Sequence, residues 1–134
     1  MPFEANWFVD GKVVFDRVVG DIDAQMIAEH DQVISAFLNA ADSPKMHMIV
    51  DFSKVGTLPS VSAFTDIHWT KDDRLGWVVV YGVDSAVVKF ISTVVLQMTS
   101  VSHKFVDTKE DAIGFLASIN ALTAPAQLPP AAAM

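Results

Sequence analysis

The stretch that decides the fold runs from Met46 to Phe64 and reads MHMIVDFSKVGTLPSVSAF. It begins with a short, mostly apolar run that closes on Asp51 and Phe52, and it then continues through small residues. A run of this kind predicts a strand that is buried on both faces. In an open α/β sheet, the loop that follows such a strand is where a binding site usually lies.

The end of the same stretch predicts the start of a helix over residues 60–68. Ser60 and Ser62 flank this start, so their hydroxyls lie where unpaired backbone N–H groups favour an anion or a phosphate. Asp51 and Ser53, at the end of the preceding strand, are further candidates for the same site. Each has a structural alternative, because Ser60 is also a good helix cap and Asp51 with Ser53 also suits a turn.

The residues before this stretch predict an antiparallel hairpin and a long helix. Asp10 and Gly11 separate two β-prone runs, which is a strong hairpin signal. Gly20 ends the second strand, and from Ala24 to Ala40 the apolar residues fall on one face of a helix. His30 lies in the middle of that face, where its ring needs a hydrogen-bonding partner. We interpret it as a satisfied boundary residue rather than a ligand or an acid–base group.

The residues after the stretch predict two further strands, each followed by a helix. The strands are Trp77–Tyr81 and His103–Val106, and the helices run over residues 85–100 and from Asp107 to Ile119. The resulting fold class is α/β: one mixed, mainly parallel sheet of about five strands that opens with an antiparallel hairpin, with about four helices mainly on one face. We expect one domain over residues 1–122 and a flexible Ala/Pro tail over residues 123–134.

Composition narrows the function. The chain has 134 residues, 51% of them hydrophobic and 19% charged, which is typical of a packed domain. Its net charge of -7 argues against nucleic acid as a partner. The chain has no cysteine and no apolar run long enough for a transmembrane segment, and its first residues do not resemble a secretory signal, so we expect a cytoplasmic protein.

No pattern in the sequence assigns a nucleophile and a base, so we expect a protein that is not an enzyme, with no catalytic residues and no cofactor. Asp66, His68, Asp72 and Asp73 lie near one another in the sequence but lack a recognised ligand spacing, so we expect no metal. The weakest alternative is an enzyme that uses Asp51 with His68 or His47.

The helix over residues 85–100 carries more apolar surface than one sheet face needs. This surplus is either a wide core face or an exposed patch that marks a dimer contact or an apolar ligand. In the second case the ligand would lie between this helix, the first helix and the turn from Trp69 to Trp77. The candidates for such a ligand or dimer surface are Phe64, Trp69, Val88, Phe90, Val95, Leu96 and Met98, of which we expect Phe64, Phe90 and Met98 to line the pocket.

Two segments resemble a known family. Val50–Val55 (VDFSKV) and Phe105–Ala112 (FVDTKEDA), in the predicted order of elements, are similar to the STAS and SpoIIAA-like domains of the anti-anti-sigma-factor fold, over roughly Trp7 to Ile119. The resemblance implies a bacterial regulatory domain that acts by protein–protein contact. It places Asp51 and Ser53 in the family's Asp-x-Ser pattern.

The resemblance also puts Ser60 on the position that a partner kinase phosphorylates in the family. Pro59, Val61 and Ser62 depart from the family's Asp-Ser-Ser-Gly loop, so the phosphoacceptor signature is degraded. The apolar second helix is more similar to the SpoIIAA-like and lipid-binding SEC14-related branch. The resemblance therefore implies either a protein partner, a regulator or a kinase, or an apolar small molecule or lipid, and we expect a homodimer.

Overall fold

Five strands form one mixed sheet whose spatial order, β1-β2-β3-β4-β5, is also the order along the chain. The computed structural model describes residues 3–122. Strands β1 and β2 pair in antiparallel fashion, and every other neighbouring pair is parallel, which confirms the predicted fold class. The strands are β1 (Phe3–Val9), β2 (Val13–Gly20), β3 (Met46–Val55), β4 (Leu75–Tyr81) and β5 (His103–Val106).

Within residues 3–122 there are three α-helices and two short 3₁₀ segments, where about four helices were expected. The helices are α1 (Ala24–Ala40), α2 (Ala86–Met98) and α3 (Lys109–Ser118), and the 3₁₀ segments are η1 (Val61–Phe64) and η2 (Trp69–Lys71). Each α-helix begins after a residue whose side chain accepts a hydrogen bond from the first turn, namely Asp23, Ser85 or Thr108.

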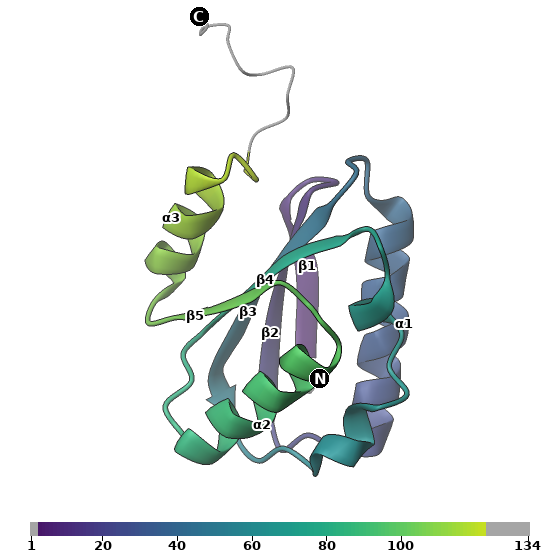
Figure 1. Cartoon of the computed structure of the whole chain (residues 1–134), viewed down its shortest axis with the longest axis vertical. Helices are drawn as coiled ribbons and strands as arrows, with labels where there is room; N and C mark the ends of the chain where they lie inside the picture. The colour runs from purple at the N-terminus through teal and green to yellow at the C-terminus, as the bar shows by residue number, and fades with distance from the viewer. Residues whose placement is uncertain (1–2, 123–134) are drawn as a thin grey trace, which may run out of the picture.

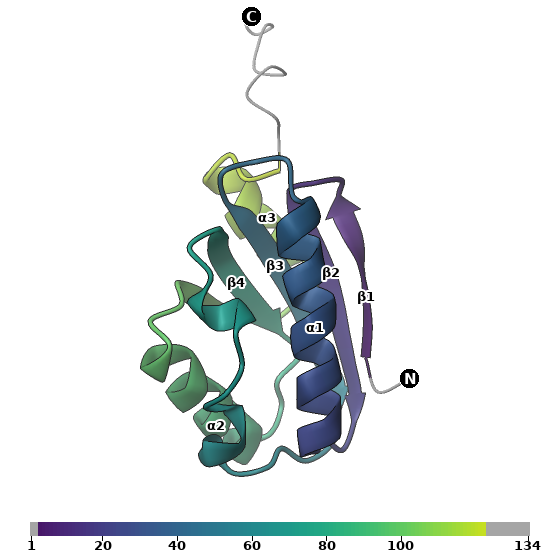
Figure 2. The same cartoon turned by 90° about the vertical axis from the view of Figure 1, so that its right-hand side faces the viewer.

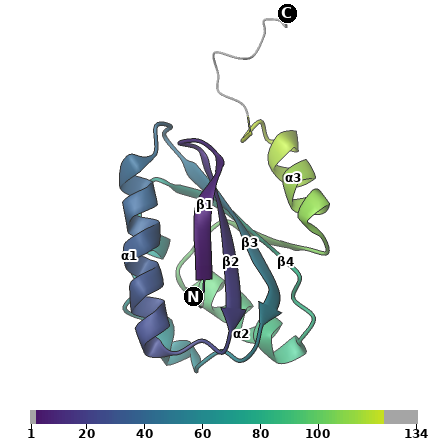
Figure 3. The same cartoon turned by 180° about the vertical axis from the view of Figure 1, so that it is seen from behind.

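The helices are divided between the two faces of the sheet. Because the strand order never reverses, right-handed connections place α1 and α2 on the same face. Helix α3 follows the last strand and folds back over the opposite face, so that α1 and α3 lie on opposite sides of the sheet (Figures 1 and 3). Two of the three helices therefore lie on the same face, which agrees with the expectation of helices mainly on one face. In Figure 2, α1 stands in front of β2, β1 lies to the right of α1, and α2 lies below β4.

Alternate residues of the central strands supply two separate cores. Met48, Val50 and Val80 belong to the core under α1 and α2. Ile49 and Val79, one position along the same strands, belong to the smaller core under α3. This alternation explains why the run in β3 is apolar throughout, because both of its faces are covered.

The prediction of a helix over residues 60–68 is wrong. The chain forms η1, a turn, and then η2. In a continuous helix, the N–H groups of His68 and Trp69 would bond to carbonyls four residues earlier. Both instead donate to Oδ1 of Asp31 on α1, at 2.9 and 3.0 Å. A long-range carboxylate therefore replaces the local pattern.

The tail expected over residues 123–134 lies outside the described residues. Among residues 3–122, no helix has the length and apolar character needed to cross a membrane.

Candidate functional site

A cavity of about 110 Å³ lies between the sheet and the layer formed by α1, α2 and the two 3₁₀ segments. Its lining includes Val18, Phe52 and Val80, from the later parts of β2, β3 and β4. The carboxyl ends of these strands form the end of the sheet where α2 packs (Figures 1 and 3). This is the position in which open α/β sheets usually bind ligands. Its apolar lining consists of Val18, Ile22, Met26, Ile27, Val50, Phe52, Leu58, Phe64, Ile67, Trp69, Val78, Val80, Ile91, Val95 and Leu96.

Four polar residues interrupt this apolar lining: Asp16, His30, Thr70 and Ser92. Asp16 comes from β2 and is only 1% exposed. Its Oδ2 atom lies 2.6 Å from Nε2 of His30 on α1. The His30 ring also makes edge contacts with Phe3 and Trp69, at centroid distances of 5.0 and 5.8 Å. The predicted boundary histidine therefore has its hydrogen-bonding partner, and that partner is a buried carboxyl group.

Three atoms of these polar side chains are buried without a partner among residues 3–122. They are Oδ1 of Asp16, Oγ1 of Thr70 and Oγ of Ser92. Buried polar atoms in folded proteins almost always have a hydrogen-bonding partner, and a missing one costs free energy. All three residues are among those that line the cavity.

Asp31 anchors the wall that carries Trp69 and Thr70. Its Oδ1 atom accepts the backbone N–H groups of His68 and Trp69, and its Oδ2 atom lies 2.8 Å from Nδ1 of His68. Burial raises the pKa of Asp31, but the bonds from the His68 side chain and from the backbone of His68 and Trp69 together outweigh burial, so the pKa lies below its ordinary value. This carboxylate ties η2 to α1.

The sequence-predicted phosphate site lies on the surface. Ser60 and Ser62 are both exposed, and their hydroxyl oxygens are 2.9 Å apart. Ser60 precedes η1, but its side chain makes no capping hydrogen bond there. Its hydroxyl is therefore accessible and is not used as a helix cap.

Asp51 and Ser53 form a compact turn at the end of the apolar part of β3. Oδ1 of Asp51 accepts both the N–H and the hydroxyl of Ser53, and its Oδ2 accepts from Nε of Arg17 at 3.0 Å. Burial raises the pKa of Asp51, but the bonds from Ser53 and Arg17 outweigh burial and leave it lowered. Burial, together with the charge of Asp51, raises the pKa of Tyr81 to about 12. These contacts favour the structural alternative for Asp51.

The two histidines considered as partners of Asp51 have other contacts. His68 pairs with Asp31, and Nδ1 of His47 accepts the backbone N–H of Trp77 at 2.8 Å. Burial, followed by the nearby charge of Lys45, lowers the pKa of His47. Among residues 3–122, no group of three or more acidic or histidine residues is arranged to hold a metal ion.

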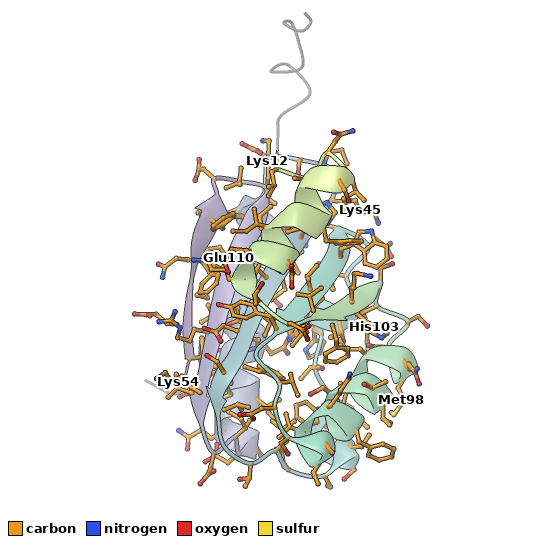
Figure 4. All side chains as sticks on the ribbon, turned by 90° about the vertical axis from the view of Figure 1, so that its left-hand side faces the viewer. Lys12, Lys45, Lys54, Met98, His103 and Glu110 are labelled. Carbon is orange, nitrogen blue, oxygen red and sulfur yellow. The ribbon has the colours of Figure 1, made fainter. Side chains whose placement is uncertain are left out.

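The residues proposed as a ligand or dimer surface separate into two groups. Phe64, Trp69, Val95 and Leu96 line the cavity, and Val88 is buried nearby in α2. Phe90 and Met98 do not line the cavity, because the turn of α2 directs them outward, where they are 68% and 57% exposed. Figure 4 shows Met98 at the outer end of α2. The cavity therefore lies between the elements that were named for it, with Phe90 outside it. Met98 instead lines a second hollow, together with Phe64 and Val95.

Sequence reasoning missed Asp16, Thr70 and Ser92. A signal existed for Asp16, because it lies in an otherwise apolar row of β2 between Val14 and Val18, which face the same core. A carboxylate in a buried strand row and a histidine on the apolar face of the next helix are candidates for a pair. Nothing local distinguishes Thr70 or Ser92 from other hydroxyl residues.

Comparison with known proteins identifies the fold. The sequence matches no family model and no curated protein. The structure is similar to an uncharacterised protein of the DUF3478 family with a SpoIIAA-like fold from Shewanella loihica PV-4, with a TM-score of 0.62 and 15% identity over 85% of this chain and 91% of that chain.

Two further similar structures are forms of SpoIIAA. The unphosphorylated anti-sigma factor antagonist SpoIIAA has a TM-score of 0.58 and 16% identity, covering 86% of this chain and 97% of that chain. The phosphorylated Bacillus cell fate determinant SpoIIAA has a TM-score of 0.52 and 14% identity, covering 85% and 98%. The chain therefore has the SpoIIAA-like α/β fold.

Proposed function

We propose that this chain is a non-enzymatic binding domain that takes a small apolar molecule into the cavity beneath α1 and α2 and serves as its carrier or sensor. The observation that carries this proposal is the combination of an apolar cavity of about 110 Å³ with three buried polar atoms that have no partner within residues 3–122. An apolar pocket with a few converging polar groups is the usual form of a small-molecule site.

The size of the cavity limits the ligand. An engineered protein cavity of roughly 150 Å³ binds benzene. A cavity of about 110 Å³ therefore suits one small ring or a short chain. A larger ligand requires movement of the half-buried lining residues Leu58, Phe64 and Ile91, which come from the loop before η1, from η1 and from α2.

The arrangement of the polar groups favours binding over catalysis. A hydroxyl nucleophile needs a base within hydrogen-bonding distance. In the described part of the chain, neither Thr70 nor Ser92 hydrogen-bonds to His30 through its hydroxyl. His30 is instead bonded to Asp16 through Nε2.

An NMR titration of the ¹⁵N-labelled chain with toluene tests the proposal. We expect saturable shifts centred on the cavity-lining residues, and native mass spectrometry of freshly purified protein checks for a co-purifying ligand. Ser92→Leu fills the cavity and should abolish the shifts. Thr93→Leu is the matched control, because Thr93 is the next residue of α2 and does not line the cavity. Absence of saturable shifts in the unmodified chain contradicts the proposal.

A second candidate function is regulation through protein contact, with residues 57–64 as the recognition surface. Two observations favour it: Ser60 and Ser62 are exposed, and Leu58 and Phe64 of the same segment line the cavity. The segment thus has one side toward a bound ligand and the other toward solvent. Ser60 is the proposed phosphoacceptor or anion-binding residue.

Incubation with ATP and a candidate kinase, followed by mass spectrometry, tests the role of Ser60. We expect a phosphate that is lost in Ser60→Ala and retained in the neighbouring Ser62→Ala. A phosphate on Ser62 alone contradicts the assignment.

The outer face of α2 is the proposed self-association surface. Val87, Phe90 and Met98 are its exposed apolar side chains. Sedimentation of the chain should show a dimer that dissociates in Phe90→Ser and persists in Lys89→Ser, which alters the preceding residue of the same helix. A wild-type monomer contradicts the homodimer.

A further inference from the structure

Asp16, one of the few polar residues that line the cavity, carries an acceptor that has no donor. Asp16 is almost completely buried in β2, and its Oδ2 atom is the one that lies 2.6 Å from Nε2 of His30. The other carboxyl oxygen, Oδ1, has no hydrogen-bonding partner among residues 3–122. A buried carboxyl oxygen without a donor carries a substantial desolvation cost.

The identity of this missing partner does not depend on where the shared proton lies. If the proton is on Nε2 of His30 and Asp16 is ionised, both oxygens of Asp16 are carboxylate oxygens. If it is on Oδ2, then Oδ1 is the carbonyl oxygen of the acid. In both cases Oδ1 is an acceptor and carries no hydrogen. The complementary group on a ligand must therefore donate a hydrogen bond.

Two hydroxyl residues on other elements also line the cavity. Thr70 lies in η2 and Ser92 in α2, and each is less than a tenth exposed, with a hydroxyl that has no partner within the described residues. A hydroxyl both donates and accepts. A ligand group that donates to Asp16 and also accepts from Thr70 or Ser92 would satisfy both kinds of atom.

We infer that the cavity selects an uncharged ligand with a hydroxyl head, a small phenol or alcohol, whose hydroxyl donates to Oδ1 of Asp16 and accepts from Thr70 or Ser92. This inference rests on the proposed function. An alcohol or phenol hydroxyl performs both roles with one atom. A carboxylate ligand only accepts, and it would bring a buried negative charge next to the carboxyl group of Asp16.

The decisive experiment compares three probes of similar size with the intact chain: phenol, toluene and benzoate. Toluene has the shape of phenol without the donor. A buried hydroxyl that finds no partner costs roughly 1–3 kcal/mol, so an indifferent cavity would bind phenol about five- to a hundredfold more weakly than toluene. We expect phenol to bind at least as tightly as toluene, and benzoate not to bind.

Variants assign the preference to individual groups. Thr70→Val replaces the hydroxyl with a methyl group of the same size, and Ser92→Ala removes the other hydroxyl. In the double variant, phenol should weaken about five- to tenfold relative to toluene, which is the loss of about one hydrogen bond. Thr93→Ala is the control, because the Thr93 hydroxyl donates to the carbonyl of Lys89 and does not line the cavity.

The outcomes separate this inference from the proposed function. If toluene binds and phenol binds at least fivefold more weakly, or benzoate binds best, the inference is overturned while the binding function stands. If the double variant leaves the phenol-to-toluene ratio unchanged, the hydroxyl contacts are overturned. If none of the three probes binds in the cavity, the proposed function fails, and this inference fails with it.

Discussion

Oδ1 of Asp31, on α1, accepts the backbone N–H of Trp69 at 3.0 Å. This bond fixes η2, which forms one wall of the cavity, to α1, which forms the adjacent wall. The same oxygen accepts the N–H of His68, and Oδ2 contacts the His68 ring. One carboxylate on a regular helix thus determines the path of the irregular segment that encloses the site.

Asp31→Asn should lower the stability of the protein at pH 7 by about 1–3 kcal/mol, because hydrogen bonds to a charged acceptor are lost. The pKa of Asp31 is lower in the folded chain than its ordinary value of 3.8. Its stabilisation is therefore complete above the unfolded-state pKa and is lost as the pH falls through the folded-state pKa. Urea denaturation at pH 7 and below pH 4 should show the difference between variant and wild type shrinking with acid.

Asp66→Asn is the control for this measurement, because Asp66 is an exposed carboxylate in the same segment. It should change the stability by no more than about 0.5 kcal/mol. An Asp31→Asn variant that behaves like Asp66→Asn would contradict the anchoring role.

Three glycine-to-alanine changes separate backbone strain from steric contact. Gly82 has a φ of +82°, and an added Cβ would lie 2.8 Å from the backbone nitrogen of Ser53. Gly20 has a φ of +77° with nothing within 4 Å of the added Cβ, and Gly114, inside α3, has neither feature. Thermal denaturation should rank Gly82→Ala as the most destabilised and Gly20→Ala as losing about 1 kcal/mol. Gly114→Ala should gain about 0.5–1 kcal/mol. Equal losses at residues 82 and 20 would show that the close approach to Ser53 is unimportant.

Tyr81 reports on the cluster at the end of β3 and β4. The chain contains a single tyrosine, so tyrosinate absorbance arises from this residue alone. Burial and the Asp51 carboxylate raise its pKa to about 12, because both disfavour the phenolate. A spectrophotometric titration should therefore have its midpoint near 12, and Asp51→Asn should move it toward the ordinary value. A midpoint near 10 in the folded wild-type protein would contradict the described contact.

The pair of Asp16 and His30 should show strong coupling in a double-mutant cycle. Removing one partner leaves the other buried, so Asp16→Leu and His30→Leu should each cost about 3 kcal/mol or more. The double variant should cost less than the sum, because it leaves no buried orphan. Additive losses measured by urea denaturation would show that the two side chains do not depend on each other.

The sequence predicted the sheet and helix α1 well because those elements have strong local signals. The Asp-Gly pair at residues 10–11 and the apolar run from Met46 need no tertiary information. The failure at residues 60–68 has a tertiary cause, since Asp31 lies more than thirty residues away from the N–H groups that it binds.

The candidate site was predicted only in part. The helices that enclose the cavity were identified from their apolar faces, and Phe64, Trp69, Val95 and Leu96 were among the residues named. The polar residues of the lining were not predicted, because Asp16, Thr70 and Ser92 come from three separate elements. Their convergence depends on strand register and helix packing, which no local pattern encodes.

A crystal structure of the full chain grown with phenol tests the central claim most directly. We expect one phenol ring within the apolar lining under α1 and α2, with its oxygen within hydrogen-bonding distance of Oδ1 of Asp16. Crystals that show the ring only on the outer surface, or a cavity filled by side chains of α2 in the presence of saturating phenol, would contradict the account.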